Sequence, residues 1–326
     1  ELMDNAIDSR DKESEDTLEI FIEIPGASRI NQGAKITIRD TGVGMNSEEL
    51  NKALKAGYSG QNTSDDNLGL FGMGFNISTA KLGNKTTVWT STKEMDEEIG
   101  LEIDLLKMQR EGAYKCEVKE RKNTELSPIG QSGTIITVKD YTDEGKRLLI
   151  NRPAIINGMK NAYSKSLFKR YNIKCLVNDE ELVGKNFLTW DHNQEGRHGT
   201  YKGQQFEPYV EIQEQKLKSV PYCTYCLSED RFIAGDTLPN ECSTCGQSGF
   251  IQTKDYIVSG WLGIQLFFHP KDYGVDIVRN GRIIEHNNKE IFYFEPRDKH
   301  GLDDDKINRL QTARTWGNVP SALYEA

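Results

Sequence analysis

Three short segments near the start of the chain constrain its fold more than any other feature. They are Glu1-Leu-Met-Asp-Asn5-Ala-Ile-Asp8, Asp40-Thr-Gly42-Val-Gly44-Met45 and Gly69-Leu-Phe-Gly72-Met73-Gly74-Phe75. Each segment alone is a weak signal, whereas their order and spacing together leave few competing interpretations. They fit neither common glycine-rich phosphate loop, because the chain has no G-x-x-x-x-G-K-[ST] and the second segment lacks the third glycine of G-x-G-x-x-G.

The first segment has the polar spacing of one helix face. Glu1, Asn5 and Asp8 are four and three residues apart, so they share that face if the segment is helical. A carboxylate one turn before an amide oxygen can orient a water molecule. The amide oxygen can meanwhile hold magnesium, which prefers oxygen ligands and keeps several waters. The alternative is a surface helix with scattered polar residues, and these three residues alone do not decide between the two.

The second segment follows a predicted strand. Residues 35–39 alternate polar and apolar side chains, which favours a half-buried strand ending at Asp40. A buried carboxylate accepts hydrogen bonds, so Asp40 can select an amino group such as that of adenine. Gly42 and Gly44 lack Cβ atoms and allow close approach of a flat base. Taken alone, an ordinary Asp-Thr-Gly turn explains the segment equally well.

The third segment follows a polar stretch, residues 57–67, whose glycines and lack of apolar residues are typical of a lid. Beyond it, residues 75–82 are predicted to form a helix opened by Gly72-Met73-Gly74. Free N–H groups at a helix start suit phosphate oxygens. Lys81, two turns into this helix, is expected to be a solvated residue.

A fourth segment, Ser132-Gly133-Thr134, opens a β-rich strand that continues to Lys139. With these four segments the chain resembles ATPases of the GHKL superfamily, which contains gyrase-type topoisomerases, large heat-shock chaperones, sensor histidine kinases and MutL. It looks most similar to members of the MORC and MutL type. Members of the superfamily place structure before the first helix, so we expect the chain to be a fragment or to lack residues there.

The resemblance implies a magnesium-dependent ATPase with a role for each matching residue. Glu1 would be the general base, Asn5 the magnesium ligand and Asp40 the residue that selects adenine. The full set expected to bind ATP is Asn5, Asp8, Asp40, Gly42, Gly44, Met45, Gly69, Gly72, Met73, Gly74, Phe75 and Thr134. The family mechanism implies slow hydrolysis, closure of the lid and dimerisation of two ATP-bound protomers as a clamp.

The resemblance and the pattern of elements predict an α+β chain. Residues 1–150 are expected to form the GHKL α/β sandwich with a mixed sheet, with strands near 18–25, 35–39, 85–92 and 133–139. Residues 151–326 are expected to form a second α/β domain that resembles a ribosomal-protein fold. It would begin with a helix from about 152 to 170 and a strand at 172–177, and include a β-hairpin around Asn280-Gly281. Lys271, Arg279 and Arg282 are candidates for contact with the γ-phosphate.

Four cysteines make the second strong pattern. Cys223, Cys226, Cys242 and Cys245 have the spacing C-x₂-C-x₁₅-C-x₂-C, which is typical of a structural zinc ribbon with four thiolate ligands. We predict such a ribbon as an insertion at residues 219–250. Two disulfides and a redox dithiol are the alternatives. The chain shows no secretory signal to favour disulfides, and two equivalent C-x-x-C pairs argue against a single redox pair. Cys116 and Cys175 are expected in the core, and His192 and His198 at the surface.

Composition limits the partners. The 326 residues carry a formal net charge of −9, which makes the whole chain a poor electrostatic match to DNA. No apolar run approaches membrane length, so we expect no membrane contact and a cytoplasmic location, or a nuclear one in a eukaryote.

Three functional classes stay open. They are an ATPase clamp on DNA or chromosome-associated partners, a chaperone-like ATPase acting on protein clients, and a nucleotide-switched scaffold with little turnover. The hairpin and the ribbon favour the first class.

Overall fold

The structure is a computed structural model that describes residues 1–53, 67–69, 74–113, 115–122, 132–185, 199–201, 204–206, 209–226, 238, 240–264, 275–288 and 320–325. Its contacts divide the chain into two units, Glu1–Asn186 and Phe187–Ala326.

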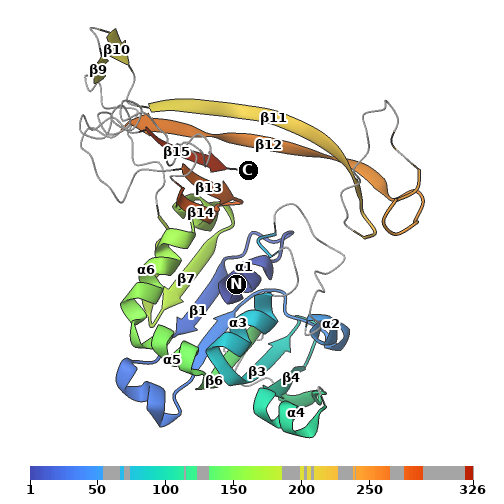
Figure 1. Cartoon of the computed structure of the whole chain (residues 1–326). Helices are drawn as coiled ribbons and strands as arrows, with labels where there is room; N and C mark the ends of the chain where they lie inside the picture. The colour runs from blue at the N-terminus through green and yellow to red at the C-terminus, as the bar shows by residue number, and fades with distance from the viewer. Residues whose placement is uncertain are drawn as a thin grey trace, which may run out of the picture. The chain divides into compact units, whose positions relative to one another are not determined.

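The first unit is built on a sheet of eight strands in the order β5-β4-β3-β6-β2-β1-β7-β8 (Figure 1). The strands are β1 (Leu18–Glu23), β2 (Ile36–Asp40), β3 (Gly83–Ser91), β4 (Glu97–Asp104), β5 (Lys119–Lys122), β6 (Gly133–Tyr141), β7 (Ile173–Val177) and β8 (Glu180–Glu181). β1 and β7 pair in parallel, while the other neighbours pair antiparallel. The predicted mixed sheet is therefore confirmed.

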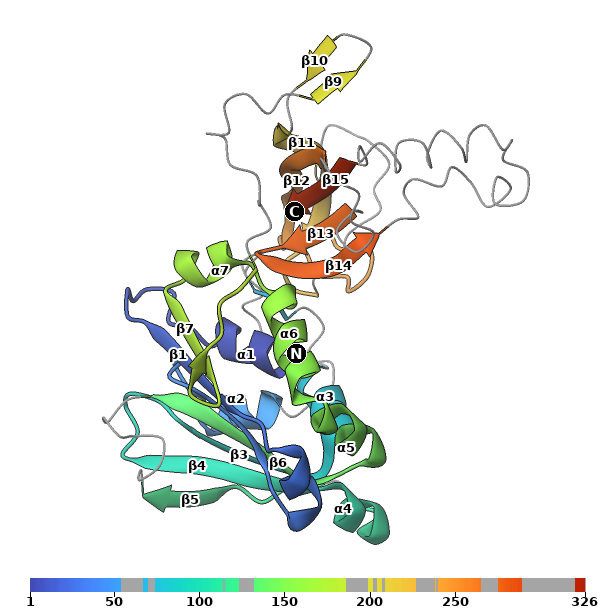
Figure 2. The ribbon, with the colours of Figure 1, turned by 90° about the vertical axis from the view of Figure 1, so that its left-hand side faces the viewer.

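Helices pack on this sheet through its apolar face. They are α1 (Leu2–Asp8), α2 (Ser47–Ala53), α3 (Gly74–Leu82), α4 (Leu105–Glu111), α5 (Asp143–Ile150), α6 (Arg152–Ala162) and α7 (Lys165–Arg170), with a short 3₁₀ helix η1 (Ala27–Gln32). α1 contacts β1 and β2, and α3 contacts β3 and β6 (Figure 2). Along β2, Ile36, Ile38 and Asp40 are buried, while Thr37 and Arg39 on the opposite face are partly exposed. This alternation follows from the two-residue period of a strand.

The helix predicted from about 152 to 170 is interrupted. α6 ends at Ala162, the backbone of the following Tyr163 is extended (φ −123°, ψ 138°), and α7 begins after Ser164. The Ser164 hydroxyl accepts a hydrogen bond from the Leu167 N–H at 3.0 Å, which is the usual role of serine before a first helical turn. A continuous helix was therefore a wrong prediction.

The segment that follows these helices also belongs to the first unit. β7 pairs with β1 from Leu18 opposite Ile173 to Ile22 opposite Val177. The division by contacts falls after Asn186. The predicted domain boundary at residue 150 thus lies inside the first unit, because parallel pairing with β1 joins residues 173–177 to the N-terminal sheet.

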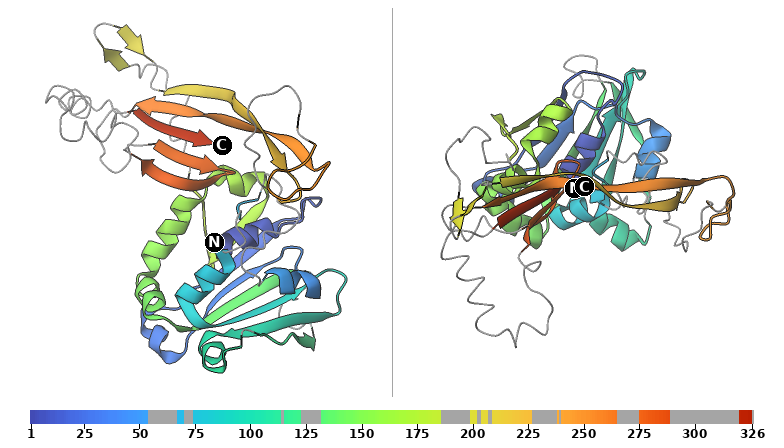
Figure 3. Two further views of the ribbon diagram at one scale, coloured as in Figure 1. Left: turned by 45° about the vertical axis from the view of Figure 1, so that its right-hand side comes forward. Right: turned by 90° about the horizontal axis from the view of Figure 1, so that it is seen from above.

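The second unit contains a five-stranded sheet in the order β11-β12-β15-β13-β14 and a small pair, β9 and β10. Its strands are β9 (Gly199–Tyr201), β10 (Gln204–Phe206), β11 (Tyr209–Cys223), β12 (Ile251–Ile264), β13 (Val275–Arg279), β14 (Arg282–Asn288) and β15 (Pro320–Glu325). β11 and β12 form one long antiparallel ribbon (Figure 3). All regular elements described in this unit are strands, so its likeness to a ribosomal-protein fold stays a prediction.

The predicted hairpin is confirmed. β13 and β14 pair antiparallel, with Arg279 opposite Arg282. Asn280 and Gly281 between them have φ of 50° and 77°, which suits the mirror-image turns that connect twisted strands. Among the described residues, no helix is both long and apolar enough to span a bilayer.

Candidate nucleotide site and cysteine cluster

α1 presents its polar face to the third glycine segment. Leu2, Met3, Ala6 and Ile7 are buried, which leaves the face of Glu1, Asn5 and Asp8 partly open. Glu1 caps the helix, and its carboxylate lies directly against Gly74, the first residue of α3. A Cβ atom on Gly69 would lie 3.8 Å from Asn5 Oδ1. The structure therefore brings the predicted base and metal ligand to the two described ends of the predicted phosphate loop.

Asp8 holds the main chain that leads into this loop. Its carboxylate accepts hydrogen bonds from the N–H groups of Leu68 and Gly69, each at 2.8 Å. Burial raises the pKa of Asp8, while these two N–H groups and Arg10, with its Nη1 3.8 Å away, oppose the rise. The described contacts of Asp8 position the loop. Contact with ATP itself stays a prediction.

Asp40 is a buried carboxylate at the end of β2. Its Oδ1 accepts the Ser9 hydroxyl and the Gly42 N–H, both at 3.0 Å. Burial raises the pKa of Asp40 to about 6, against the opposing effect of hydrogen bonds from Gly42, Ser9 and the Thr134 main chain. The carboxylate is thus a buried hydrogen-bond acceptor at the end of β2.

Two threonines, Thr90 and Thr134, lie at the same end of the sheet as Asp40. Thr134 on β6 lies opposite both Asp40 on β2 and Thr90 on β3. Its hydroxyl lies 3.1 Å from that of Thr90, and both residues are buried. Thr90 Oγ1 also accepts the Met45 N–H at 2.9 Å and donates to the Gly133 carbonyl at 3.0 Å. Thr90 therefore ties the predicted residues Met45 and Thr134 together.

Glycine is needed where the main chain crosses this end of the sheet. Gly44 has φ of 70°, and a Cβ atom there would overlap the Ser91 carbonyl. A Cβ atom on Gly42 would overlap Ser9. The segment after Asp40 can therefore pass close to its neighbours only with glycine at both positions.

The structure brings Glu1, Asn5, Asp8, Gly69 and Gly74 together, and separately Asp40, Gly42, Gly44, Met45 and Thr134. Phe75, on α3, packs against the core. Gly72, Met73 and residues 57–66 of the expected lid lie outside the described residues, as do Lys271, His192 and His198. Sequence reasoning missed Ser9 and Thr90. A signal existed for Thr90, since it lies in a predicted strand, but only the strand register places it beside Thr134.

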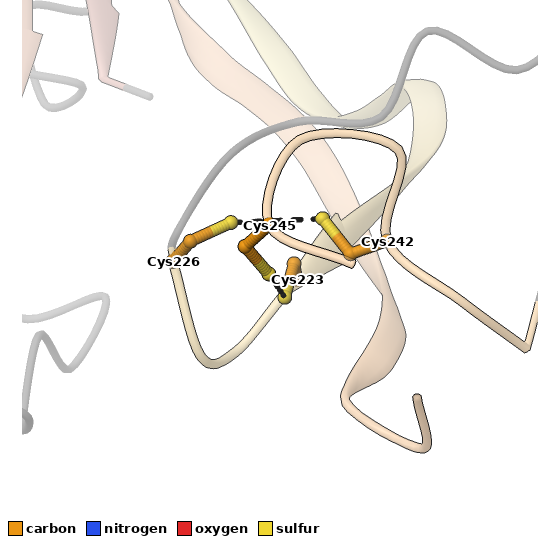
Figure 4. Close-up of side chains that lie close together, drawn as sticks. All are labelled: Cys223, Cys226, Cys242 and Cys245. Atoms are coloured by element: carbon orange, nitrogen blue, oxygen red, sulfur yellow. Dashed lines mark hydrogen bonds between the residues drawn. The ribbon is translucent and has the colours of Figure 1, made fainter. Parts of the chain in front are cut away.

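The four cysteines converge at the end of the β11–β12 ribbon. Cys223 ends β11, Cys226 lies in the following turn, and Cys242 and Cys245 form a second turn before β12 (Figure 4). All four sulfurs lie within 4.8 Å of one another. The Cys223–Cys245 and Cys226–Cys242 sulfurs are 3.7 and 3.6 Å apart. None of the four cysteines forms a disulfide.

These distances fit one tetrahedral metal. A zinc–sulfur bond of about 2.3 Å places sulfurs about 3.8 Å apart in a tetrahedron, whereas a disulfide needs about 2.05 Å. Gly246, with φ of 71°, donates its N–H to the Cys242 carbonyl at 2.8 Å and closes the second turn. The geometry therefore favours a closed thiolate site over the disulfide alternative. Of the other cysteines, Cys175 is buried and Cys116 partly buried against the core, as predicted.

The first unit is similar in sequence to known proteins. Residues 1–134 match the family model described as histidine kinase-, DNA gyrase B- and HSP90-like ATPase. These residues form a GHKL ATPase domain. The chain is also similar to Protein MICRORCHIDIA 4 of Arabidopsis thaliana, at 31% identity over 142 residues. The similarity covers 40% of this chain and 17% of that protein.

Among solved structures, the ATPase region of Saccharomyces cerevisiae topoisomerase II aligns with 100% of this chain and 71% of its own length. The TM-score is 0.46 and the identity 11%.

Proposed function

We propose that the first unit binds ATP with magnesium and hydrolyses it. The observation that carries this proposal is the position of the Glu1 carboxylate against Gly74 at the start of α3, with Asn5 Oδ1 facing Gly69. A base and an oxygen ligand thereby face both described ends of the same loop. This arrangement suits a phosphate chain lying between α1 and the N-terminus of α3.

Each residue then has a defined task. Asp40 accepts a hydrogen bond from the amino group of adenine, and Gly42 and Gly44 let the main chain beside Asp40 pass close to Ser9 and Ser91. Asn5 supplies an oxygen to magnesium, and the main chain of residues 69–74 holds the phosphates. Magnesium supplies charge neutralisation on the phosphate oxygens. Glu1 orients a water molecule and takes its proton at the carboxylate.

We further propose that ATP binding drives closure and dimerisation, so that two protomers form a clamp on DNA or on chromosome-associated partners. This proposal depends on the family match of residues 1–134 and on the similarity of the chain to Protein MICRORCHIDIA 4. Action on a protein client and a nucleotide-switched scaffold with little turnover are the other outcomes of the test. In the second unit, zinc held by the four cysteines would fix the end of the ribbon.

The test compares Glu1→Gln with Glu13→Gln in the full chain. Glu13 is exposed and makes the same change of charge outside the site. We expect Glu1→Gln to lower magnesium-dependent ATP turnover by about 100-fold or more, because a general base typically contributes that much. ATP affinity should change little, and Glu13→Gln should behave as the unmodified protein. Unchanged turnover in Glu1→Gln would rule out this base.

The same assay distinguishes the three candidate functions. Stimulation of turnover by duplex DNA, decreasing steeply with salt, would support the clamp on DNA. ATP turnover that DNA does not change would favour action on a protein client. Tight ATP binding without turnover would favour a nucleotide-switched scaffold. A monomeric mass in saturating non-hydrolysable ATP analogue would contradict dimerisation.

A further inference from the structure

A buried hydrogen bond joins α1 to the junction of α6 and α7. The Tyr163 hydroxyl donates to Asp4 Oδ1 at 2.6 Å. Asp4 is 1% exposed and Tyr163 is 4% exposed. A buried carboxylate requires hydrogen-bond donors, and bonds to a charged group are among the strongest in a protein. This contact is therefore a fixed feature of the folded unit.

Asp4 acts on the turn of α1 that carries the proposed base. Glu1 is the N-cap of α1, and Asp4 is the third residue of the helix. The second carboxylate oxygen of Asp4 lies 3.5 Å from the Glu1 nitrogen, which is the amino group at the start of this sequence, so the contact is an ion pair. An acidic side chain at this position that reaches back to the cap fixes the first turn of a helix. The Asp4 carboxylate thus lies between Tyr163 and the main chain from which the Glu1 side chain extends.

Tyr163 is itself held by the segment that leads out of the first unit. The Lys185 N–H donates to the Tyr163 carbonyl at 2.9 Å, and the Lys165 N–H donates to the Lys185 carbonyl at 2.8 Å. A Cβ atom on Gly184 would lie 2.8 Å from the Tyr163 carbonyl oxygen, so the close approach depends on glycine. Residue 185 is the last one described before the second unit begins at Phe187.

We propose that Tyr163 is a positioning residue for Glu1 and that it couples the proposed base to the connecting segment, residues 184 and 185 at the end of the first unit. Through Asp4 it fixes the first turn of α1. Because the Tyr163 carbonyl contacts residues 184 and 185, a shift of these two residues would also shift the first turn of α1. The inference rests on the proposed function for its effect on turnover. The hydroxyl acts through Asp4 and does not touch the substrate.

Removal of this hydroxyl should affect chemistry more than binding. Without it, Asp4 loses a hydrogen-bond donor inside the core and has to reorient. The first turn of α1 then loosens and Glu1 moves, and a displacement of about 1 Å can cost about 100-fold in rate. The adenine end of the site lies on β2 and β6, so ATP affinity should change much less.

The experiment compares Tyr163→Phe with Tyr141→Phe in the full chain. Tyr141 is also buried, but it lies at the opposite end of β6 from Thr134. We expect Tyr163→Phe to lower ATP turnover by about 10- to 100-fold, with ATP affinity within about threefold. Hydrogen exchange of residues 1–8 should rise selectively. Tyr141→Phe should leave turnover and the exchange of these residues unchanged.

A third variant tests the connecting segment. Gly184→Ala keeps the hydroxyl but crowds the carbonyl groups of Tyr163 and Ser164, so it should raise hydrogen exchange in residues 1–8 and lower ATP turnover, as Tyr163→Phe does. Unchanged hydrogen exchange of residues 1–8 and unchanged ATP turnover in Gly184→Ala would show that residues 184 and 185 do not influence Glu1.

Two results would overturn the role of Tyr163. One is Tyr163→Phe behaving as Tyr141→Phe in both measurements. The other is an equal loss of turnover, ATP affinity and thermal stability, which would indicate a structural role only. If the unmodified protein shows no turnover, the proposed function fails, and the exchange of residues 1–8 still decides whether Tyr163 positions α1.

Discussion

The two candidate sites of this chain are assembled in opposite ways. The nucleotide site of the first unit brings together residues far apart in sequence, such as Asp40 on β2 and Thr134 on β6. The cysteine cluster takes all four residues from one segment, 223–245. The first site depends on the register of a large sheet, whereas the second depends on two local turns. Disruption of each site should therefore have different consequences.

The packing around the two sites differs as well. α1 and β2 are part of the apolar core of the first unit, which includes Ile7, Ile20 and Val138 at 0% exposure. At the end of the β11–β12 ribbon, Cys223 and Cys242 are buried, while Tyr225 and Phe250 are exposed. The described residues of this segment bury little apolar surface, so another source of stability is needed, and a metal bound by the four cysteines would supply it.

The largest effect is expected from Cys242→Ser. Structural zinc contributes about 10–16 kcal/mol to the folding of small zinc domains, so loss of one ligand should abolish zinc binding and disorder residues 223–250. ATP affinity and the thermal unfolding of the first unit should stay unchanged. Metal content, together with hydrogen exchange of the two units, measures both effects. Cys116→Ser is the control, because Cys116 lies outside the cluster. Zinc retained at one per chain in Cys242→Ser would contradict the assignment.

A smaller effect is expected from Asp40→Asn. An asparagine carbonyl can still accept from Ser9 and Gly42, but its amide would present a donor to the amino group of adenine. Loss of a hydrogen bond to a charged group costs about 1.5–3 kcal/mol, which corresponds to a decrease in ATP affinity of about 10- to 100-fold. Calorimetric titration with ATP checks this, with the exposed Asp96→Asn as control.

The same substitution should raise stability. The pKa of Asp40 increases from 3.8 to about 6 through burial, so the ionised carboxylate opposes folding at pH 7 by up to about 3 kcal/mol. Asp40→Asn removes that cost, and the melting temperature should rise while affinity falls. A decrease in both would indicate that Asp40 is a structural residue of the core.

The comparison also explains what could be predicted from sequence. Strands β1, β2, β3 and β6 were expected close to their observed bounds, because alternating polarity is a local signal. The cysteine cluster was predictable for the same reason, since its spacing alone aims four sulfurs at one point. Asp40 and Glu1 were recognised through the family resemblance.

What escaped prediction depends on long-range contacts. The break between α6 and α7 lies at Tyr163, whose hydroxyl bonds Asp4 from the other end of the unit. The boundary after Asn186 results from the pairing of β7 with β1. Ser9 and Thr90 carry no motif and gain their positions from contact with Asp40 and Thr134. Strand β4 (Glu97–Asp104) was also missed, because the polar sequence of these residues does not favour a strand. Its Glu98 is nevertheless fully buried, paired with Arg121.

The smallest effect is a pH dependence confined to the nucleotide site. Only ionised Asp40 presents two acceptor oxygens, so protonation near its pKa of about 6 should weaken ATP binding as pH falls. The apparent dissociation constant scales with the inverse of the ionised fraction, which predicts a weakening of about fourfold from pH 7 to pH 5.5. Zinc binding by the four cysteines involves no residue of the nucleotide site, so the zinc affinity should not change with the protonation of Asp40.

Stability should change in the opposite direction over the same range. A carboxyl group whose pKa is higher in the folded state than in the unfolded state binds more protons when folded, between pH 3.8 and about 6. Its contribution to stability is therefore present at low pH and is lost as pH rises through 6. Because ATP itself titrates in this range, the measurement is the difference between the unmodified protein and Asp40→Asn. If that difference in affinity is constant from pH 7 to pH 5.5, Asp40 does not make the proposed contact with adenine.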